Sequence, residues 1–388
     1  MSERIALISV TKNGALWGQR IKGVYKNKGL FPVCYEKAAY ASGQEAILYD
    51  RLSSDYMGQL FKTYDKLLCI MATGITVRLL APWIVHKAAD PAVLVMDEQA
   101  QHVISLLSGH LGGANEWAQD IAQITGAEPV ITTATDVNNK KAPDVLARHM
   151  GVVISSYETL RQINAAIVGG AQVSYYIDKE LVHCKTYCQK AKKAGFTIKP
   201  ISLTDFTEKL DLSSAIVTDD TEKKSASAEL DYKQSVKKLK NWQVLITDAS
   251  IASRLGLLVL VPKTITIGIG CRRGTTKEEI LTAVDQSLTH LGKSPYSVLT
   301  AASVIVKANE AGLLAAMKER QWPIYFYKQE EMTALADQSF IHTSEFVKQT
   351  IGVGNVCEIT ALLAAHSQKL LQEKTIYPKT TVAIAQVQ

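Results

Sequence analysis

The stretch ISLLSGHLGGANEWAQDIAQI, residues 104–124, indicates the fold of the first part of the chain. It begins with an apolar run typical of a buried strand, passes through a turn with three glycines, and ends with apolar residues at helical spacing. The residues on one face of this helix are Ala114, Trp117, Ala118, Ile121, Ala122 and Ile124. A strand, a tight turn and a helix in succession predict an α/β domain.

The segments on either side continue the same alternation. Short apolar runs at 5–10, 67–71 and 129–134 are typical of buried strands, and helical patterns lie between them. The runs 92–97 and 102–107 are separated by only four residues, so they predict a β-hairpin. We therefore expect residues 1–140 to form an α/β domain with a mainly parallel sheet.

The rest of the chain predicts two further domains. Residues 141–262 are less regular and indicate a smaller α/β middle domain, in which the polar segment 218–238 is expected to be an exposed loop. Residues 263–388 regain the α/β alternation and predict a C-terminal domain with a mainly parallel sheet. Its expected strands are 264–270, 297–303, 323–327 and 380–386, and its expected helices are 276–292, 310–320 and two near Ser344 and Glu358.

Composition limits the classes of function. The chain has 388 residues, a formal net charge of +6 and 21% charged residues, which is ordinary for a globular protein. No basic run alternates with aromatic residues, so we expect no nucleic-acid partner. No apolar stretch reaches the roughly 18 residues of a membrane span, and no signal peptide is evident. The six cysteines form no C-x-x-C pair, which favours reduced thiols in the cytoplasm.

The glycine-rich turn is the first candidate for chemistry. His110 can accept or donate a proton near neutral pH, and backbone N–H groups near Gly112 and Gly113 can hold a developing oxyanion. Ser108 and Asn115 flank the same turn. The alternative is a structural turn in which the serine and asparagine cap the next helix and the histidine is solvated.

A second turn, ATGITVR at 72–78, joins an apolar run to a helical pattern. The N–H groups at Thr73 and Gly74 would lie at the positive end of the helix dipole, and Arg78 follows one turn later, so this segment suits a carboxylate or phosphate. The alternative is an ordinary strand-to-helix turn.

A third turn, GIGCRRGTTKEE at 268–279, follows the strand expected at 264–270. Its glycines, including Gly270, differ by one residue from the dinucleotide-binding spacing, and Arg272 and Arg273 can bind carboxylates bidentately. Because ligands of open α/β sheets bind at the carboxyl ends of strands, we expect these turns to meet around an anionic ligand between the first and last domains.

Six segments together resemble the cobalt-precorrin-5A hydrolase family over nearly the whole chain, least at 180–245. They are MATGITVRLLAP, DPAVLVMDE, ISLLSGHLGGANEWA, PVITTATDVN, GIGCRRGT and SEFVKQTIGVGNVCE. The resemblance implies a cobalt-bearing, ring-contracted tetrapyrrole substrate with carboxylate arms, whose lactone is opened by water with release of acetaldehyde. It also matches Lys307 to a family lysine, although Ala311 replaces the usual proline.

From residue type and position, we expect His110 to be the base that activates water, with Ser108, Gly112 and Gly113 as oxyanion donors. Glu116 or Asp97 would orient the histidine. The residues expected to bind the substrate are Arg78, the Thr73–Gly74 turn, Asn115, Gly270, Arg272, Arg273 and Lys307.

We expect no metal or cofactor of the protein's own, because the substrate carries the cobalt and its macrocycle can accept electrons. Two alternatives stay open at this point: a carrier that binds tetrapyrroles without turnover, and a nucleotide-dependent oxidoreductase that uses the 268–274 turn. A homodimer and transient contacts with neighbouring pathway enzymes are further expectations.

Overall fold

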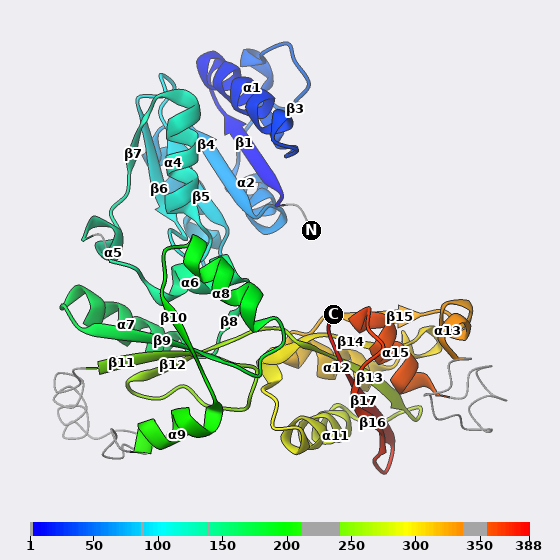
Figure 1. Cartoon of the computed structure of the whole chain (residues 1–388). Helices are drawn as coiled ribbons and strands as arrows, with labels where there is room; N and C mark the ends of the chain where they lie inside the picture. Colours follow the sequence, from blue (N-terminus) through cyan, green and yellow to red (C-terminus); the bar gives the residue numbers. More distant parts are fainter. Residues whose placement is uncertain (1–2, 87–88, 139, 212–240, 337–354) are drawn as a thin grey trace, which may run out of the picture. The chain divides into compact units, whose positions relative to one another are not determined.

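The computed structural model describes all residues except 1–2, 87–88, 139, 212–240 and 337–354 (Figure 1). The chain divides into two compact units. The first comprises residues 1–150 and 164–171, and the second comprises residues 151–163 and 172–388. The first unit contains one sheet and the second contains two, so the α/β fold class predicted from the sequence is confirmed.

The sheet of the first unit has seven strands in the order β3-β2-β1-β4-β5-β6-β7. The strands are β1 (Ile5–Ser9), β2 (Val33–Lys37), β3 (Ile47–Tyr49), β4 (Lys66–Ile70), β5 (Ala92–Met96), β6 (His102–Leu107) and β7 (Glu128–Val130). The first five are parallel to one another, β6 pairs antiparallel with β5 as the hairpin prediction requires, and β7 is parallel to β6.

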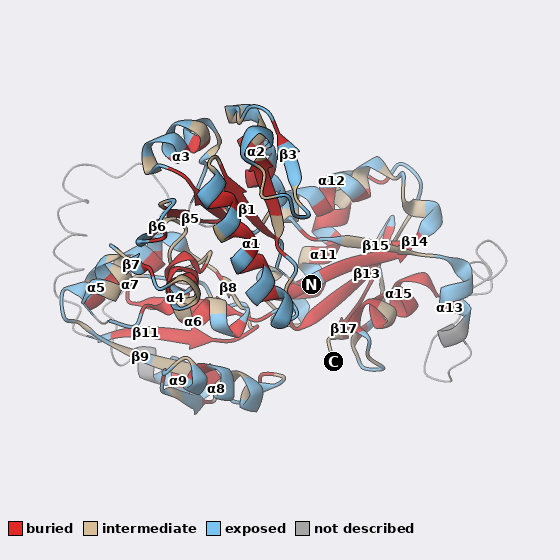
Figure 2. Cartoon of the chain, turned by 90° about the horizontal axis from the view of Figure 1, so that it is seen from above, coloured by how far each residue is buried: buried red, intermediate tan, exposed pale blue. Residues whose placement is uncertain are grey.

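Helices cover both faces of this sheet, and alternate strand residues pack on opposite faces. Leu7 belongs to one apolar cluster with Ile21 and Trp117, whereas Ile8 belongs to another with Phe61. The helices are α1 (Lys12–Asn27), α2 (Ser54–Thr63), α3 (Thr73–Leu80), α4 (Ala114–Thr125), α5 (Ala134–Val137) and α6 (Pro143–Met150), with 3₁₀ turns η1 (Ala38–Tyr40) and η2 (Ala81–Trp83). Burial on both faces explains the continuous apolar runs in the sequence. Figure 2 shows the central strands buried.

The reversed direction of β6 decides where the candidate turns lie. The turn at 72–74 follows β4, whereas the turn at 108–113 follows β6, which runs in the opposite direction. These two turns therefore lie at opposite edges of the same sheet. The expectation that they meet around one ligand is wrong, because a hairpin between β5 and β6 reverses the chain before the second turn.

The second unit begins with a five-stranded sheet of order β10-β9-β11-β12-β8. Its strands are β8 (Val153–Ile154), β9 (Gln172–Asp178), β10 (Ile198–Ile201), β11 (Asn241–Ile246) and β12 (Leu257–Val261). All pairs are parallel except that of β8 with β12. The helices in this part of the chain are α7 (Tyr157–Val168), α8 (Cys184–Lys193) and α9 (Leu203–Asp211). The predicted loop at 218–238 lies outside the described residues.

The other sheet of the second unit has the order β15-β14-β13-β17-β16. Its strands are β13 (Ile265–Cys271), β14 (Val298–Val304), β15 (Ile324–Tyr327), β16 (Leu370–Ile376) and β17 (Thr380–Gln386). The first three are parallel, and β17 pairs antiparallel with β13 and β16. The helices are α11 (Lys277–His290), α12 (Ala311–Arg320), α13 (Gln329–Ala336) and α15 (Val356–Ala365), with 3₁₀ turns η3 (Pro295–Ser297) and η4 (Ile305–Lys307). The helix expected near Ser344 lies outside the described residues.

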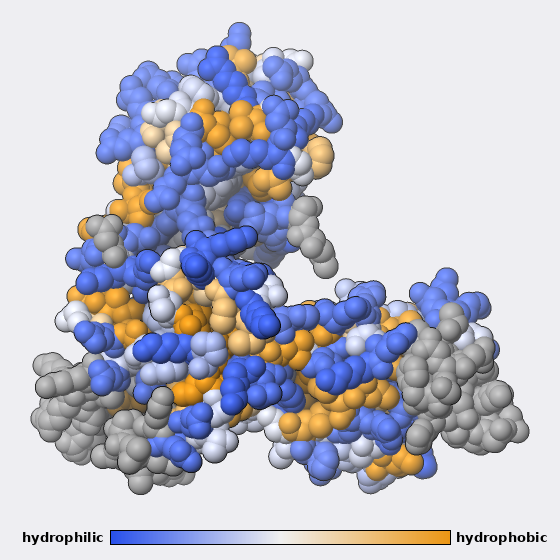
Figure 3. Space-filling view, in the orientation of Figure 1, coloured by the Kyte–Doolittle hydropathy of each residue, from blue (hydrophilic) through white to orange (hydrophobic). Residues whose placement is uncertain are grey.

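Hydrophilic residues cover much of the face shown in Figure 3, with smaller apolar groups between them. In the part of the chain that the structure describes, none of the helices has both the length and the apolar character needed to cross a membrane.

Candidate active site

His110 lies in the turn between β6 and α4, between two aspartates. Its Nε2 atom is 2.5 Å from Oδ2 of Asp136, and its Nδ1 atom is 3.0 Å from Oδ2 of Asp144. The Thr135 hydroxyl is 3.1 Å from Nε2. The side chains of His110 and Asp144 are only 9% and 6% exposed, whereas that of Asp136 is 36% exposed. Asp136 is therefore the carboxylate of this cluster that solvent or a ligand can reach.

The two carboxylates determine the charge of His110. Burial alone lowers the pKa of the imidazole, but the hydrogen bonds and charges of Asp144 and Asp136 outweigh it and raise that pKa to about 9. At neutral pH the ring is thus an imidazolium that donates a hydrogen bond to each aspartate. A protonated imidazole can give a proton but cannot accept one, which bears directly on the role expected of His110 as a base.

Asn115 connects this cluster to the sheet. Its Oδ1 atom accepts a 2.7 Å hydrogen bond from Ser105, and its Nδ2 atom donates to Thr133 and to Oδ2 of Asp136, both at 3.0 Å. The Asn115 side chain is almost fully buried. It therefore positions Asp136 from within the protein and presents little surface to a ligand.

Strand pairing explains why these residues meet. Because β6 and β7 are parallel neighbours, the turn at 108–113 and the segment at 131–136 leave the sheet at the same edge. Ser108 has a positive φ of 56°, and its hydroxyl donates to the carbonyl of Asp90 at 2.8 Å. The Ser108 side chain is thus anchored to the chain just before β5. Within the described part of the chain, the hydrogen-bond partners of the His110 ring are Asp144, Asp136 and Thr135 rather than Ser108.

Each glycine of the turn avoids a collision inside the protein. A Cβ at Gly109 would lie 2.6 Å from the Asn115 side chain, and one at Gly112 would lie 2.6 Å from Ser108. At Gly113, where φ is +79°, it would lie 2.8 Å from the Arg148 guanidinium. Internal packing is therefore sufficient to account for all three glycines, independently of any ligand.

The carboxylates expected to orient His110 have other partners. Glu116 forms ion pairs with Arg148 and with His149, the second at 2.9 Å. Asp97 accepts backbone hydrogen bonds in the hairpin turn before β6. The expectation for these two residues is corrected: Asp136 and Asp144 hold the imidazole. Sequence reasoning missed both aspartates. Asp136 follows the strand expected at 129–134, but that strand ends at Val130, and its pairing with β6 was not predicted.

The turn that begins α3 is separate from this cluster. Ala72 provides no side-chain cap, so the first N–H groups of the helix, near Thr73 and Gly74, are available to an anion. Arg78 instead donates a 2.9 Å hydrogen bond to the carbonyl of Gly74 in its own helix. This turn lies at the opposite edge of the sheet from His110.

The remaining expected binding residues lie in the second unit. Gly270 is inside β13, where a Cβ would lie 2.5 Å from the Thr381 hydroxyl. Arg272 and Arg273 are exposed directly after β13, and Lys307 lies after β14, where it pairs with Glu310 at 3.2 Å. The parallel pairing of β13 and β14 places these three cations at one edge of their sheet.

The geometry after β13 does not fit a dinucleotide-binding turn. Gly268 and Gly270 lie within the strand, and a Cβ at Gly268 would meet the carbonyl of Cys357 in α15. The N-terminus of α11 is also closed by a capping box in which Thr276 and Glu279 bond each other's backbone N–H groups. The oxidoreductase alternative requires glycines in the turn and an open helix start, so it loses its support.

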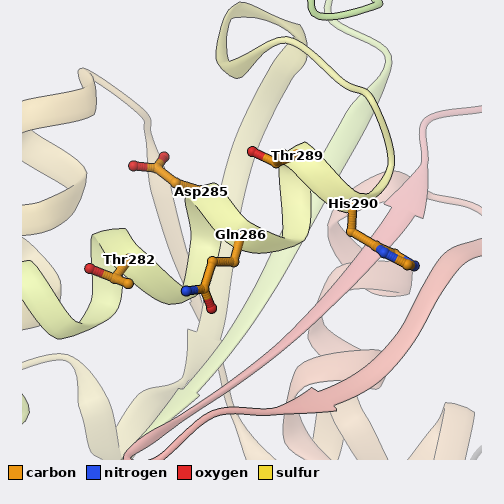
Figure 4. Close-up of a pocket in the computed structure, with 5 residues that line it drawn as sticks. All are labelled: Thr282, Asp285, Gln286, Thr289 and His290. Carbon is orange, nitrogen blue, oxygen red and sulfur yellow. The ribbon is translucent and has the colours of Figure 1, made fainter.

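One shallow pocket of about 530 Å³ lies on α11 (Figure 4). It is lined by side chains of that helix alone: Thr282, Asp285, Gln286, Thr289 and His290. Asp285 is already bound by Arg320 at 2.5 Å. This pocket belongs to the second unit and contains none of the expected site residues.

Two parts of the chain match models of known protein families, and these parts contain most of the site residues described above. Residues 55–136 match the family described as Cobalamin synthesis G N-terminal, and residues 265–385 match Cobalamin synthesis G C-terminus. His110, Asn115 and Asp136 lie within the first match, and Arg272, Arg273 and Lys307 within the second.

Curated relatives cover nearly the whole chain. The cobalt-precorrin-5A hydrolase of Salmonella typhimurium is 32% identical over 372 residues, covering 95% of this chain and 93% of that protein. The enzyme of the same name from Priestia megaterium is 26% identical, covering 98% and 94%. Protein CobE of a Sinorhizobium species is 30% identical over 122 residues, covering 31% of this chain and 79% of that protein. The chain therefore belongs to the cobalt-precorrin-5A hydrolase family.

Proposed function

We propose that this protein is a cobalt-precorrin-5A hydrolase of anaerobic cobalamin biosynthesis. Water opens the lactone of the cobalt-bearing tetrapyrrole, and the two-carbon fragment leaves as acetaldehyde to give cobalt-precorrin-5B. Relatives of that name align with the chain over nearly its full length, which supports this assignment. A cluster suited to proton transfer, formed by His110 with Asp136 and Asp144, is the structural observation that carries it.

In this proposal the base that accepts the proton of water is Asp136, whereas the sequence-based hypothesis gave that role to His110. Asp136 is the carboxylate that can be reached, so it takes the proton of the attacking water. The neighbouring His110 imidazolium is hydrogen-bonded to Asp136 and supplies a proton to the alkoxide that leaves when the lactone opens. Asp144 is buried and holds the opposite nitrogen of the ring, which keeps the imidazole oriented and charged.

Release of acetaldehyde then requires cleavage of a carbon–carbon bond. The hydroxyl freed by lactone opening loses its proton to the cluster, its oxygen forms the carbonyl of acetaldehyde, and the bonding electron pair passes to the macrocycle. The conjugated ring with its cobalt accepts that pair, so the proposal requires no cofactor bound permanently by the protein. The cobalt enters and leaves as part of the substrate.

We further propose that the protein acts in the cytoplasm on this small molecule. All six cysteines are free, which fits a reducing compartment. A homodimer and transient contacts with neighbouring pathway enzymes stay predictions, which light scattering and cross-linking of the purified protein would test.

The test is turnover of cobalt-precorrin-5A in water enriched in oxygen-18. The proposal predicts one labelled oxygen in the product carboxylate and one acetaldehyde per substrate consumed. Tight binding without label and without acetaldehyde would instead identify a carrier.

A further inference from the structure

The first unit contains a cavity of about 620 Å³ that borders the turn carrying His110. Residues that precede β1, β4 and β5 line it, together with Leu111 and Gly112. Its aromatic lining residues are Phe61, Tyr64 and Trp83. This volume is within the range of pockets that bind small molecules.

Trp83 presents a fixed ring to this cavity. Its Nε1–H donates hydrogen bonds to the backbone and hydroxyl of Ser54 at 2.8 and 3.1 Å. Gly58 lies directly against the ring, since a Cβ there would be 2.2 Å from it. A rigid indole with a polar edge already satisfied is suited to packing against a flat, apolar body.

Among the described residues that line the cavity, ion pairs occupy Arg4 and Lys66 and leave Lys62 for a ligand. Arg4 pairs with Asp65 at 2.9 Å, and Lys66 pairs with Glu3 at 2.6 Å. Lys62 lies 4.4 Å above the Trp83 ring, and within the described part of the chain no carboxylate lies at ion-pair distance from it. The third carboxylate, Asp90, accepts the backbone N–H of Val85. The cavity therefore combines apolar walls with a lysine that can bind an anion.

We propose that this cavity binds one carboxylate-bearing edge of the tetrapyrrole substrate. The ring edge packs against Trp83, and Lys62 binds an acetate or propionate arm. The occupant would touch the turn that carries the catalytic cluster, because Leu111 and Gly112 line the cavity. The backbone carbonyl of Asp90, another lining residue, also accepts a hydrogen bond from the Ser108 hydroxyl of that turn. This inference rests on the proposed function for the identity of the ligand, while the cavity's preference for a planar polycarboxylate can be measured separately.

The experiment titrates the purified full-length protein with uroporphyrin, a porphyrin with eight carboxylates, and measures KM for cobalt-precorrin-5A in parallel. Lys62→Met is expected to weaken uroporphyrin binding and raise KM by about five- to tenfold through loss of a charge-assisted hydrogen bond. Lys37→Met is the matched control, since Lys37 also lies over an aromatic ring, that of Tyr40 at 5.3 Å, but does not line the cavity.

A second pair of variants changes charge at the cavity without removing packed atoms. Val85 lines the cavity and is 82% exposed, so both Val85→Glu and Val85→Lys are expected to fold. Val85→Glu should weaken uroporphyrin binding severalfold, and Val85→Lys should not.

Three results would distinguish failure of the cavity proposal from failure of the proposed function. Wild-type affinity and KM in both Lys62→Met and Val85→Glu would overturn the cavity proposal. Equal losses in Lys62→Met and Lys37→Met would also overturn it, because net charge alone would then explain the effect. Absence of acetaldehyde from the wild-type protein, with uroporphyrin binding that still depends on Lys62, would contradict the proposed function and leave the cavity assignment standing.

Discussion

His110 shows how two neighbouring residues can reverse the chemistry expected of a side chain. A histidine in a glycine-rich turn suggests a neutral base, but hydrogen bonds from both ring nitrogens to carboxylates favour the charged ring. The reachable carboxylate, Asp136, then becomes the better candidate for accepting a proton. The sequence placed His110, Ser108 and Asn115 together because they share one turn. It did not reveal Asp136 and Asp144, which are 26 and 34 residues further along the chain.

Stability should depend on pH through His110. Its pKa is raised to about 9 in the folded protein from the ordinary value of 6.5, so the folded state binds the proton more tightly than the unfolded chain. The resulting stabilisation is complete below pH 6.5 and is lost as the pH rises to 9. Urea unfolding between pH 6 and pH 9.5 should show this decline in the wild type. A His110→Gln variant with the same decline would contradict the assignment.

Catalysis should depend on Asp136 more than on other exposed carboxylates. Asp136→Asn keeps the shape of the side chain but removes its capacity to accept a proton, so kcat should fall at least about a hundredfold. Acetaldehyde release under saturating substrate measures this loss. Asp55→Asn, at the exposed first turn of α2, is the control and should be as active as the wild type. Near-normal kcat in Asp136→Asn would remove Asp136 from the mechanism.

At the scale of elements, local sequence patterns predicted individual strands and helices better than they predicted the edge of the sheet at which each turn lies. The hairpin of β5 and β6 and helix α4 follow from apolar spacing and turn length, and both are confirmed. The consequence of the hairpin was missed: it reverses the chain, so the turns after β4 and β6 lie at opposite edges. Strand β16 was also missed. Its sequence LLQEKTI contains charged and polar residues, which an edge strand tolerates but which do not look like a buried strand.

The contact between α15 and β13 should be sensitive to a single methyl group. A Cβ at Gly268 would lie 1.8 Å from the carbonyl oxygen of Cys357, so the helix would have to move. Gly268→Ala should reduce the free energy of unfolding by about 3 kcal/mol or more. Gly23→Ala is the matched control: a Cβ at Gly23 in α1 meets nothing within 4 Å, and the change should stabilise by about 0.5–1 kcal/mol. Equal stability of the two variants in thermal unfolding would refute this packing role.

At the scale of the whole molecule, the sequence predicted three α/β regions, and each of the three sheets lies within one of them. Strand and helix alternation is a local property, so it could be detected in each region separately. The convergence of distant turns on one ligand depends on strand direction and on packing between regions, which local patterns do not encode. That is why the residues of the cluster around His110 were only partly found.

The second unit should contribute to substrate affinity through its basic edge. Arg272 and Arg273 are exposed, so replacing both with glutamine should raise KM about tenfold and leave the melting temperature unchanged. The matched control replaces two other exposed cations of the same unit, Lys263 and Lys318, and should leave KM near the wild-type value. If both double variants have wild-type KM, the edge formed by β13 and β14 does not bind the substrate.

The most direct test of the central claim is acetaldehyde release in a single turnover of cobalt-precorrin-5A, measured for the wild type and Asp136→Asn under identical conditions. We predict one acetaldehyde per substrate from the wild type and a rate at least about a hundredfold lower from the variant. Substrate that binds to the wild type without releasing acetaldehyde would contradict the proposed function, and equal rates from the two proteins would contradict the proposed site.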